Sequence, residues 1–274
     1  MPKLRVNNTE LYYEMEGSGP PVLLLHGLGS STREWEYQVP ALARAHRVIA
    51  MDVRGHGRSE RVPGPYSVTG FARDAAALLQ ALEATPAHVV GLSMGGMIAF
   101  QLAVDAPEAV RSLTIVNSGP AMIIRDPRLR SLIRLRLVLT KLFGMRSIAR
   151  MIADPLFPDP GQEHLRDRFR AAIAANDPRC YRAALRALYG WSVAERIGGI
   201  RCPVLIVSSD HDYTPVEFKR EYSRSIPGAR VVVIENSRHA APLDRPEELN
   251  RLILEFFSSG TSADVMQAGM KESP

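Results

Sequence analysis

Short apolar runs and longer helical patterns alternate along most of this 274-residue chain. The runs that predict buried strands are brief, rich in branched residues and closed by turn residues; they cover residues 21–26, 47–52, 87–91, 112–117, 203–209 and 230–235. The helical spacing occurs in residues 71–84, 97–106, 216–225 and 247–257. This alternation predicts an α/β fold, in which a parallel sheet is covered by helices on both faces.

The pattern changes in the middle of the chain. Between residues 121 and 197 the strand-like runs disappear, and amphipathic segments rich in Arg, Leu and Ala follow one another, separated by prolines. These segments lie near residues 128–142, 147–152, 163–174 and 179–188. We therefore expect a helical insertion at 121–197 between two parts of one core, 1–120 and 198–258. The polar residues 259–274 are expected to form a disordered tail.

Composition narrows the class of protein. Apolar residues make up 46% of the chain, as in ordinary globular proteins, and the apolar runs are too short for a membrane span, which needs roughly 18 or more residues. The first residues lack the apolar stretch of a signal peptide. Two cysteines, Cys180 and Cys202, have no metal-ligand spacing. We expect a cytoplasmic protein without a metal site.

The net charge of +5 is unevenly distributed. Residues 121–200 hold 15 Lys and Arg against 7 Asp and Glu, a balance of +8, whereas the remainder carries −3. No helix-turn-helix, zinc-finger or RNA-binding signature accompanies this basic segment, so nucleic acid is not an expected partner.

Two interpretations of the basic segment remain open. Its arginines could face the substrate and attract anionic molecules; the candidates are Arg125, Arg128, Arg130, Arg134 and Arg136. Alternatively they form a solvated outer surface, with the apolar positions of the same helix turned inward. Those positions are Leu129, Leu132, Ile133 and Leu137. The helical spacing favours the second interpretation.

Residues 91–95 read Gly-Leu-Ser-Met-Gly, which matches the pattern G-x-S-x-G. A predicted strand precedes this pattern and an Ala-rich helix follows it, as in a nucleophile elbow, where the serine lies on a strained turn at the carboxyl edge of a sheet. A serine hydroxyl is a weak nucleophile until a base removes its proton. His239, on the loop after the last predicted strand, is the candidate base for Ser93. His26 and His56 lie in glycine-rich turns and are expected to be structural.

A base of this kind needs an acid that holds its tautomer. Asp210 and Asp212 follow the predicted strand 203–209, whereas the position after strand 112–117 reads Asn117-Ser118 and offers no carboxylate. The order Ser, Asp, His along the chain is that of the α/β-hydrolase triad and differs from those of chymotrypsin and subtilisin.

Four motifs in the same order make the chain resemble the α/β-hydrolase superfamily from about Leu4 to Phe257. His-Gly-Leu-Gly at 26–29 resembles the oxyanion loop, and Asp-Val-Arg-Gly-His-Gly-Arg-Ser at 52–59 resembles a structural segment; the elbow at 91–95 and the histidine loop at 237–246 complete the set. The resemblance implies an eight-stranded, mostly parallel sheet with a helical cap inserted after strand six. It also implies oxyanion donors from the backbone N–H groups of Leu28 and Met94, and Asp212 rather than Asp210 as the acid.

The nucleophile sorts the chemistry within that superfamily. Haloalkane dehalogenases and epoxide hydrolases use Asp and dienelactone hydrolases use Cys, so Ser93 sets these groups aside. The resemblance implies a serine hydrolase that cleaves an ester, thioester or lactone of a small molecule through an acyl-enzyme. Alternatives are a C–C bond hydrolase of ring-cleavage products, a cofactor-free perhydrolase or haloperoxidase, and a hydrolase-like ligand receptor or signalling partner. No Walker loop or dinucleotide fingerprint is present, so no cofactor is expected.

Overall fold

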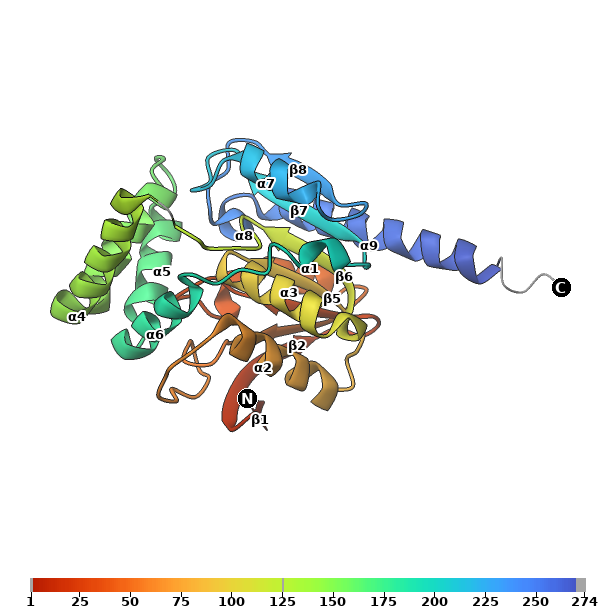
Figure 1. Cartoon of the computed structure of the whole chain (residues 1–274), viewed down its shortest axis with the longest axis horizontal. Helices are drawn as coiled ribbons and strands as arrows, with labels where there is room; N and C mark the ends of the chain where they lie inside the picture. The colour runs from red at the N-terminus through yellow and green to blue at the C-terminus, as the bar shows by residue number, and fades with distance from the viewer. Residues whose placement is uncertain (1, 125, 270–274) are drawn as a thin grey trace.

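The computed structural model describes residues 2–124 and 126–269 (Figure 1). Its centre is an eight-stranded sheet with the order β1-β2-β4-β3-β5-β6-β7-β8. The strands are β1 Lys3–Val6, β2 Thr9–Glu16, β3 Pro21–Leu25, β4 Arg47–Met51, β5 Ala87–Leu92, β6 Val110–Val116, β7 Val204–Ser209 and β8 Arg230–Ile234. Strand β2 runs antiparallel to β1 and β4, and the other neighbours are parallel. The expected α/β fold with an eight-stranded, mostly parallel sheet is confirmed.

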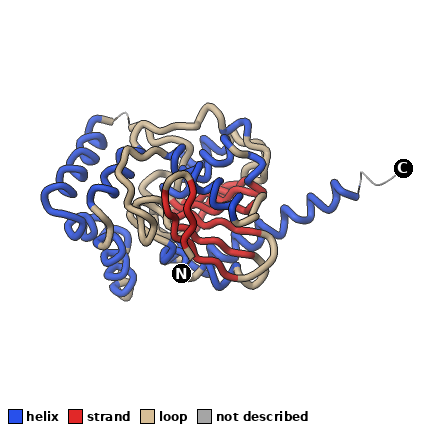
Figure 2. Tube along the Cα trace, turned by 90° about the horizontal axis from the view of Figure 1, so that it is seen from below, coloured by secondary structure: helices blue, strands red, loops and turns tan. Residues whose placement is uncertain are grey.

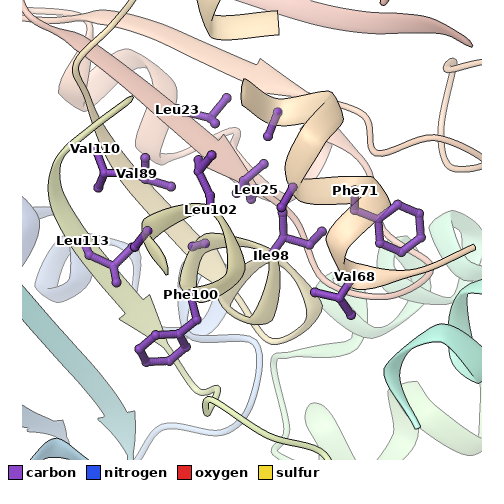
Figure 3. Packing of buried hydrophobic residues seen from close by; sticks show 14 of the residues in the cluster. Leu23, Leu25, Val68, Phe71, Val89, Ile98, Phe100, Leu102, Val110 and Leu113 are labelled. Carbon is purple, nitrogen blue, oxygen red and sulfur yellow. The ribbon is translucent and has the colours of Figure 1, made fainter. Parts of the chain in front are cut away.

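Helices cover both faces of the sheet. They are α1 Gln38–Leu42, α2 Val68–Ala81, α3 Met94–Asp105, α7 Val216–Ser223, α8 Ala241–Asp244 and α9 Pro246–Gly269, with 3-10 turns η1 Thr32–Trp35, η2 Pro107–Ala109 and η3 Ile197–Gly199. Because side chains alternate along a strand, Leu23 and Leu25 of β3 pack with α2 and α3, whereas Val22 and Leu24 pack with α1 and α9. Figure 3 shows the first of these two cores.

The N-terminal hairpin of β1 and β2 is absent from the sequence predictions. Its strands pair in antiparallel register at one edge of the sheet, and the turn between them places Asn7 and Asn8 at φ 46° and 59°. Glu10, Glu14 and Glu16 interrupt the apolar pattern of β2. An antiparallel strand with one solvent-exposed face tolerates such residues, so hydrophobic runs alone do not reveal β2.

Residues between β6 and β7 form the helices α4 Pro127–Leu156, α5 Glu163–Ala174 and α6 Pro178–Leu188, which lie together at one end of the molecule (Figure 1). Helix α4 covers two predicted segments and is broken at Gly144, where φ is 69°. Leu132 is 58% exposed, so its expected inward position is wrong, whereas Ile133 and Leu137 are half-buried. Arg125 and the side chain of Leu129 lie outside the described residues.

The C-terminal helix α9 projects beyond the body of the molecule (Figure 2). It continues through residues 259–269, where the sequence pattern predicts a disordered tail; this expectation is corrected as far as Gly269. No proline occurs between Pro246 and Pro274, so nothing in this stretch removes a donor from the helical hydrogen bonds. Residues 270–274 of the expected tail lie outside the described residues. Within the described ranges no helix is long and apolar enough to cross a membrane.

Candidate active site

Ser93 lies at the sharp turn between β5 and α3, with φ 53° and ψ −114°. A non-glycine residue in this region is strained, and the surrounding glycines make the turn feasible. A Cβ on Gly95 would overlap the carbonyl oxygen of Leu25, and one on Gly91 would overlap the backbone of Gly95. The half-buried Ser93 side chain therefore stands at the carboxyl edge of the sheet, as the nucleophile elbow predicts.

His239 and Asp212 meet at the same edge, after β8 and β7. The Nδ1 of His239 lies 2.5 Å from Oδ1 of Asp212, whose side chain is 1% exposed. Lys219 of α7 is fully buried and donates from Nζ to Oδ2 of Asp212 at 2.5 Å and to the Thr214 carbonyl at 2.6 Å. Burial raises the pKa of Asp212, but the hydrogen bonds and charges of His239 and Lys219 lower it well below its usual value. Asp212 is therefore an ionised acceptor for the His239 ring.

The second carboxylate of this loop points elsewhere. Asp210 accepts from the backbone N–H groups of Asn236 at 2.8 Å and Ser237 at 3.0 Å. It thereby braces the chain that leads to His239 and, within the described part of the chain, forms no hydrogen bond with the His239 imidazole. The structure brings Asp212, and not Asp210, to the candidate base.

Asn117 and Ser118, at the end of β6, connect the serine turn to the histidine loop. The Ser118 hydroxyl donates to the Ser93 carbonyl at 2.6 Å. The Asn117 amide donates to the carbonyls of Arg238 at 3.2 Å and His239 at 3.0 Å. Two consecutive side chains thus fix the backbones that carry the candidate nucleophile and the candidate base.

The two expected oxyanion donors lie beside this turn. Met94 is the first residue of α3, so its N–H has no acceptor within the helix. Leu28 follows β3 in a loop that is held from both sides. On one side, Asn176 of the inserted segment donates to the Gly29 carbonyl at 2.6 Å. On the other side Nε2 of His26 accepts from Val53 N–H at 3.0 Å, and burial lowers the pKa of His26 to about 4. His26 is thus a neutral, structural residue.

The segment at 52–59 is also structural in its contacts. Buried Asp52 accepts from the N–H groups of Thr32 at 2.6 Å and Arg58 at 2.7 Å. Arg54 forms an ion pair with the buried Asp74, and the ring of His56 lies 5.3 Å from that of His26. These contacts tie the loop after β4 to the loop that carries Leu28.

Glu34 is a buried carboxyl of the site that the sequence analysis does not single out. Its Oε2 accepts from Gly27 N–H at 2.7 Å, and the residue is 5% exposed. The point that a Cβ would occupy on Gly27 is 3.6 Å from this oxygen and 3.6 Å from the Cβ of Ser93. Burial raises the pKa of Glu34 to about 7, against the lowering effects of Gly27 N–H, the Ser30 hydroxyl and His239.

This raised pKa predicts a pH-dependent stability. The carboxyl titrates near 4.5 when unfolded and near 7 when folded, so the folded state binds more protons between these values and the free energy of unfolding falls as the pH rises through them. Glu34→Gln keeps an oxygen for Gly27 N–H and removes the titration. Between pH 5 and 8.5 we expect the wild type to lose about 2–3 kcal/mol relative to this variant in urea unfolding.

The matched control is Glu217→Gln, since Glu217 lies exposed on α7. It should leave the pH dependence of unfolding as in the wild type. A difference between wild type and Glu34→Gln that stays constant with pH would contradict the assignment.

No group of three or more His, Cys, Asp or Glu residues in the described ranges is arranged to hold a metal ion. The polar groups at the carboxyl edge are instead those of proton transfer and hydrogen bonding.

A model of the alpha/beta hydrolase fold matches residues 20–246 of this sequence. The chain belongs to the α/β-hydrolase family. Among the relatives of this α/β-hydrolase, a putative carbamate hydrolase RutD of Azorhizobium caulinodans is 34% identical over 264 residues, which cover 93% of this chain and 98% of the relative.

Two solved structures show how closely the fold is shared. The enol-lactonase from Burkholderia xenovorans LB400 superposes with a TM-score of 0.87 at 26% identity, covering 94% of this chain and 100% of that one. A thermophilic esterase from Thermogutta terrifontis, solved with malate bound, has a TM-score of 0.84 at 27% identity and covers 92% and 94%. This α/β-hydrolase is therefore a hydrolase of small molecules. The names of its relatives specify different substrates, namely carbamates, enol-lactones and esters.

Proposed function

We propose that this α/β-hydrolase is a serine hydrolase that cleaves a small carboxylic ester, thioester or lactone through an acyl-enzyme on Ser93. The observation that carries the proposal is the 2.5 Å contact between His239 and the buried, ionised Asp212, at the same sheet edge as the strained Ser93 turn. An imidazole held by a carboxylate at the same sheet edge as a serine on a strained turn is the arrangement of acyl-transfer hydrolases.

In acylation, Nε2 of His239 removes the proton of the Ser93 hydroxyl while Oγ attacks the substrate carbonyl. Nδ1–H donates to Asp212, which fixes the tautomer and stabilises the imidazolium that forms. The N–H groups of Leu28 and Met94 donate to the oxyanion of the tetrahedral intermediate. His239 then gives its proton to the leaving oxygen or sulfur, and the acyl group remains on Ser93.

In deacylation, His239 acts in the same way on water. It removes a proton from the water that attacks the acyl carbonyl, and it returns that proton to Oγ of Ser93 as the acid is released. Helices α4, α5 and α6 form the cap in this proposal, and the contact from Asn176 to Gly29 couples the cap to the oxyanion loop. No step needs a metal ion or an organic cofactor.

A substrate panel tests the reaction class. It compares short p-nitrophenyl esters, thioesters, lactones, carbamates, vinylogous 1,5-diketones and peracid formation. For each, kcat is measured at saturating substrate and kcat/KM at limiting substrate. We expect the ester and lactone substrates to give the highest kcat/KM. Preferred cleavage of the carbamates or of the diketones would replace the proposed bond with that one. Turnover indistinguishable from buffer for every substrate, together with tight ligand binding, would favour a receptor.

A further inference from the structure

Arg136 stands out among the arginines of α4 because its side chain is partly buried. Arg128, Arg130 and Arg134 of the same helix are exposed, whereas Arg136 is half-buried and its guanidinium contacts the hydroxyl of Tyr181 on α6. The guanidinium carbon also lies 5.3 Å from the centre of the Tyr181 ring. The sequence pattern alone does not distinguish Arg136 from the other four arginines.

Two aromatic rings reach the candidate site, and one of them, Tyr181, is the partner of Arg136. The Tyr181 ring lies against the oxyanion loop, since its Cε2 is 2.9 Å from the point that a Cβ would occupy on Gly29. The Tyr213 ring lies 4.4 Å from the ring of His239, centre to centre. Arg136 is thus bonded to the ring that packs against the oxyanion loop.

No carboxylate of the described ranges forms an ion pair with Arg136. Its Nε is buried without a hydrogen-bond partner, and Asp212 is already engaged by His239 and Lys219. A guanidinium carries five N–H donors in a planar fork that matches a carboxylate. A partly buried cation without an anionic partner costs free energy, and a carboxylate on a bound molecule would recover it.

We propose that Arg136 is a specificity-determining residue that binds a carboxylate carried by the substrate, so that this hydrolase prefers esters or lactones of dicarboxylic or hydroxycarboxylic acids. This inference rests on the proposed function, because the carboxylate is placed relative to a scissile carbonyl at Ser93. The bond from Arg136 to Tyr181 orients the fork, and the remaining donors receive the anion.

The test compares two substrates that differ in one charge, the mono-p-nitrophenyl ester of glutaric acid and its methyl ester. A charge-assisted bidentate contact gives the wild type about a 10- to 100-fold higher kcat/KM for the anionic ester, mainly through KM. Arg136→Gln should bring this ratio close to one, because kcat/KM for the anionic ester falls by a much larger factor than kcat/KM for the neutral ester. Arg136→Lys keeps the charge without the fork and should give an intermediate ratio.

Arg134→Gln is the matched control, because it removes the same charge from an exposed position on the same helix. It should retain the preference of the wild type at 0.15 M salt, where long-range steering is screened beyond about 8 Å. Equal losses in Arg134→Gln and Arg136→Gln would overturn the inference in favour of general steering by the basic segment. A wild-type ratio near one would overturn it directly.

Binding of glutarate, measured by calorimetry, needs no turnover. It therefore tests the role of Arg136 separately from the proposed esterase activity. We expect glutarate to bind the wild type and Arg134→Gln, with at least a tenfold weaker affinity for Arg136→Gln. Failure of every ester to react would contradict the proposed function, yet this binding result would still decide the role of Arg136. Equal glutarate affinities in all three proteins would refute that role whatever the esterase activity.

Discussion

Ser93→Ala is expected to lower ester turnover by a factor of about 10⁴ or more while the protein stays folded. The change deletes one oxygen atom, and no hydrogen bond among the described residues depends on that hydroxyl. The backbone contacts of this turn, from Ser93 N–H to Val116 at 3.0 Å and from Ser118 to the Ser93 carbonyl, do not require the side chain. The loss should therefore appear in kcat, because the nucleophile of the acyl-enzyme is missing.

Active-site labelling measures the same assignment independently of turnover. A serine-directed phosphonate should add one equivalent to the wild type and none to Ser93→Ala, as read by intact mass. Ser118→Ala is the control, since this neighbouring serine donates to the Ser93 carbonyl. It should still be labelled and lose far less activity than Ser93→Ala. Appreciable activity in Ser93→Ala would contradict a covalent mechanism on this residue.

The elements that position Ser93 could be predicted from the sequence because their signals are local. A parallel strand buried on both faces is a short branched run, as in β5 and β7, and the elbow glycines stand where the backbone of Gly95 meets Leu25. The eight-strand count came from the resemblance, since the hairpin of β1 and β2 carries charged residues on its exposed side.

The charged residues inside the site could not be predicted in this way. Glu34 and Lys219 are buried, although residues of these types are exposed in most proteins. Glu34 is placed by the 3-10 turn η1, which brings it to Gly27, and Lys219 is placed by α7, which brings it to Asp212. Each contact joins residues only seven positions apart, but it depends on how the loop between them turns, and no hydrophobic or motif pattern in the sequence indicates that turn.

The inserted segment shows the same limit. Helical spacing correctly indicates α5 and α6, but it does not reveal which face of α4 meets the core. Leu132 is exposed and Arg136 is half-buried, opposite to what an inward apolar stripe predicts. The contact with Tyr181 decides the orientation, and it depends on how α4 and α6 pack in space.

Asp212→Asn is expected to lower kcat by about 10⁴. Oδ1 of Asp212 accepts from Nδ1–H of His239 at 2.5 Å, and Oδ2 accepts from Nζ of Lys219 at 2.5 Å and from the Thr214 hydroxyl at 2.8 Å. An asparagine amide offers only one oxygen. If the NH₂ group faces His239, the imidazole is held in the wrong tautomer; if it faces Lys219, the ammonium loses its acceptor. The pH–rate profile and kcat of the variant, measured with a short p-nitrophenyl ester, report the loss.

Loss of folding could produce the same loss of activity, because the variant leaves the buried charge of Lys219 without its carboxylate. Breaking a buried pair in this way destabilises a protein by about 3–5 kcal/mol. Asp212→Asn combined with Lys219→Met removes the unpaired charge as well. We expect the double variant to regain much of the free energy of unfolding and none of the activity, which separates catalysis from folding.

Asp210→Asn provides the matched comparison on the same loop. Asp210 accepts from Asn236 N–H and Ser237 N–H, so its amide variant loses one of two backbone contacts and leaves the His239 ring with its acceptor. We expect kcat within about tenfold of the wild type. If Asp210→Asn instead lost about 10⁴ and Asp212→Asn remained active, the acid of the triad would be Asp210. In that case the contact between Asp212 and His239 would be a structural ion pair, and the roles proposed for Ser93 and His239 would stand.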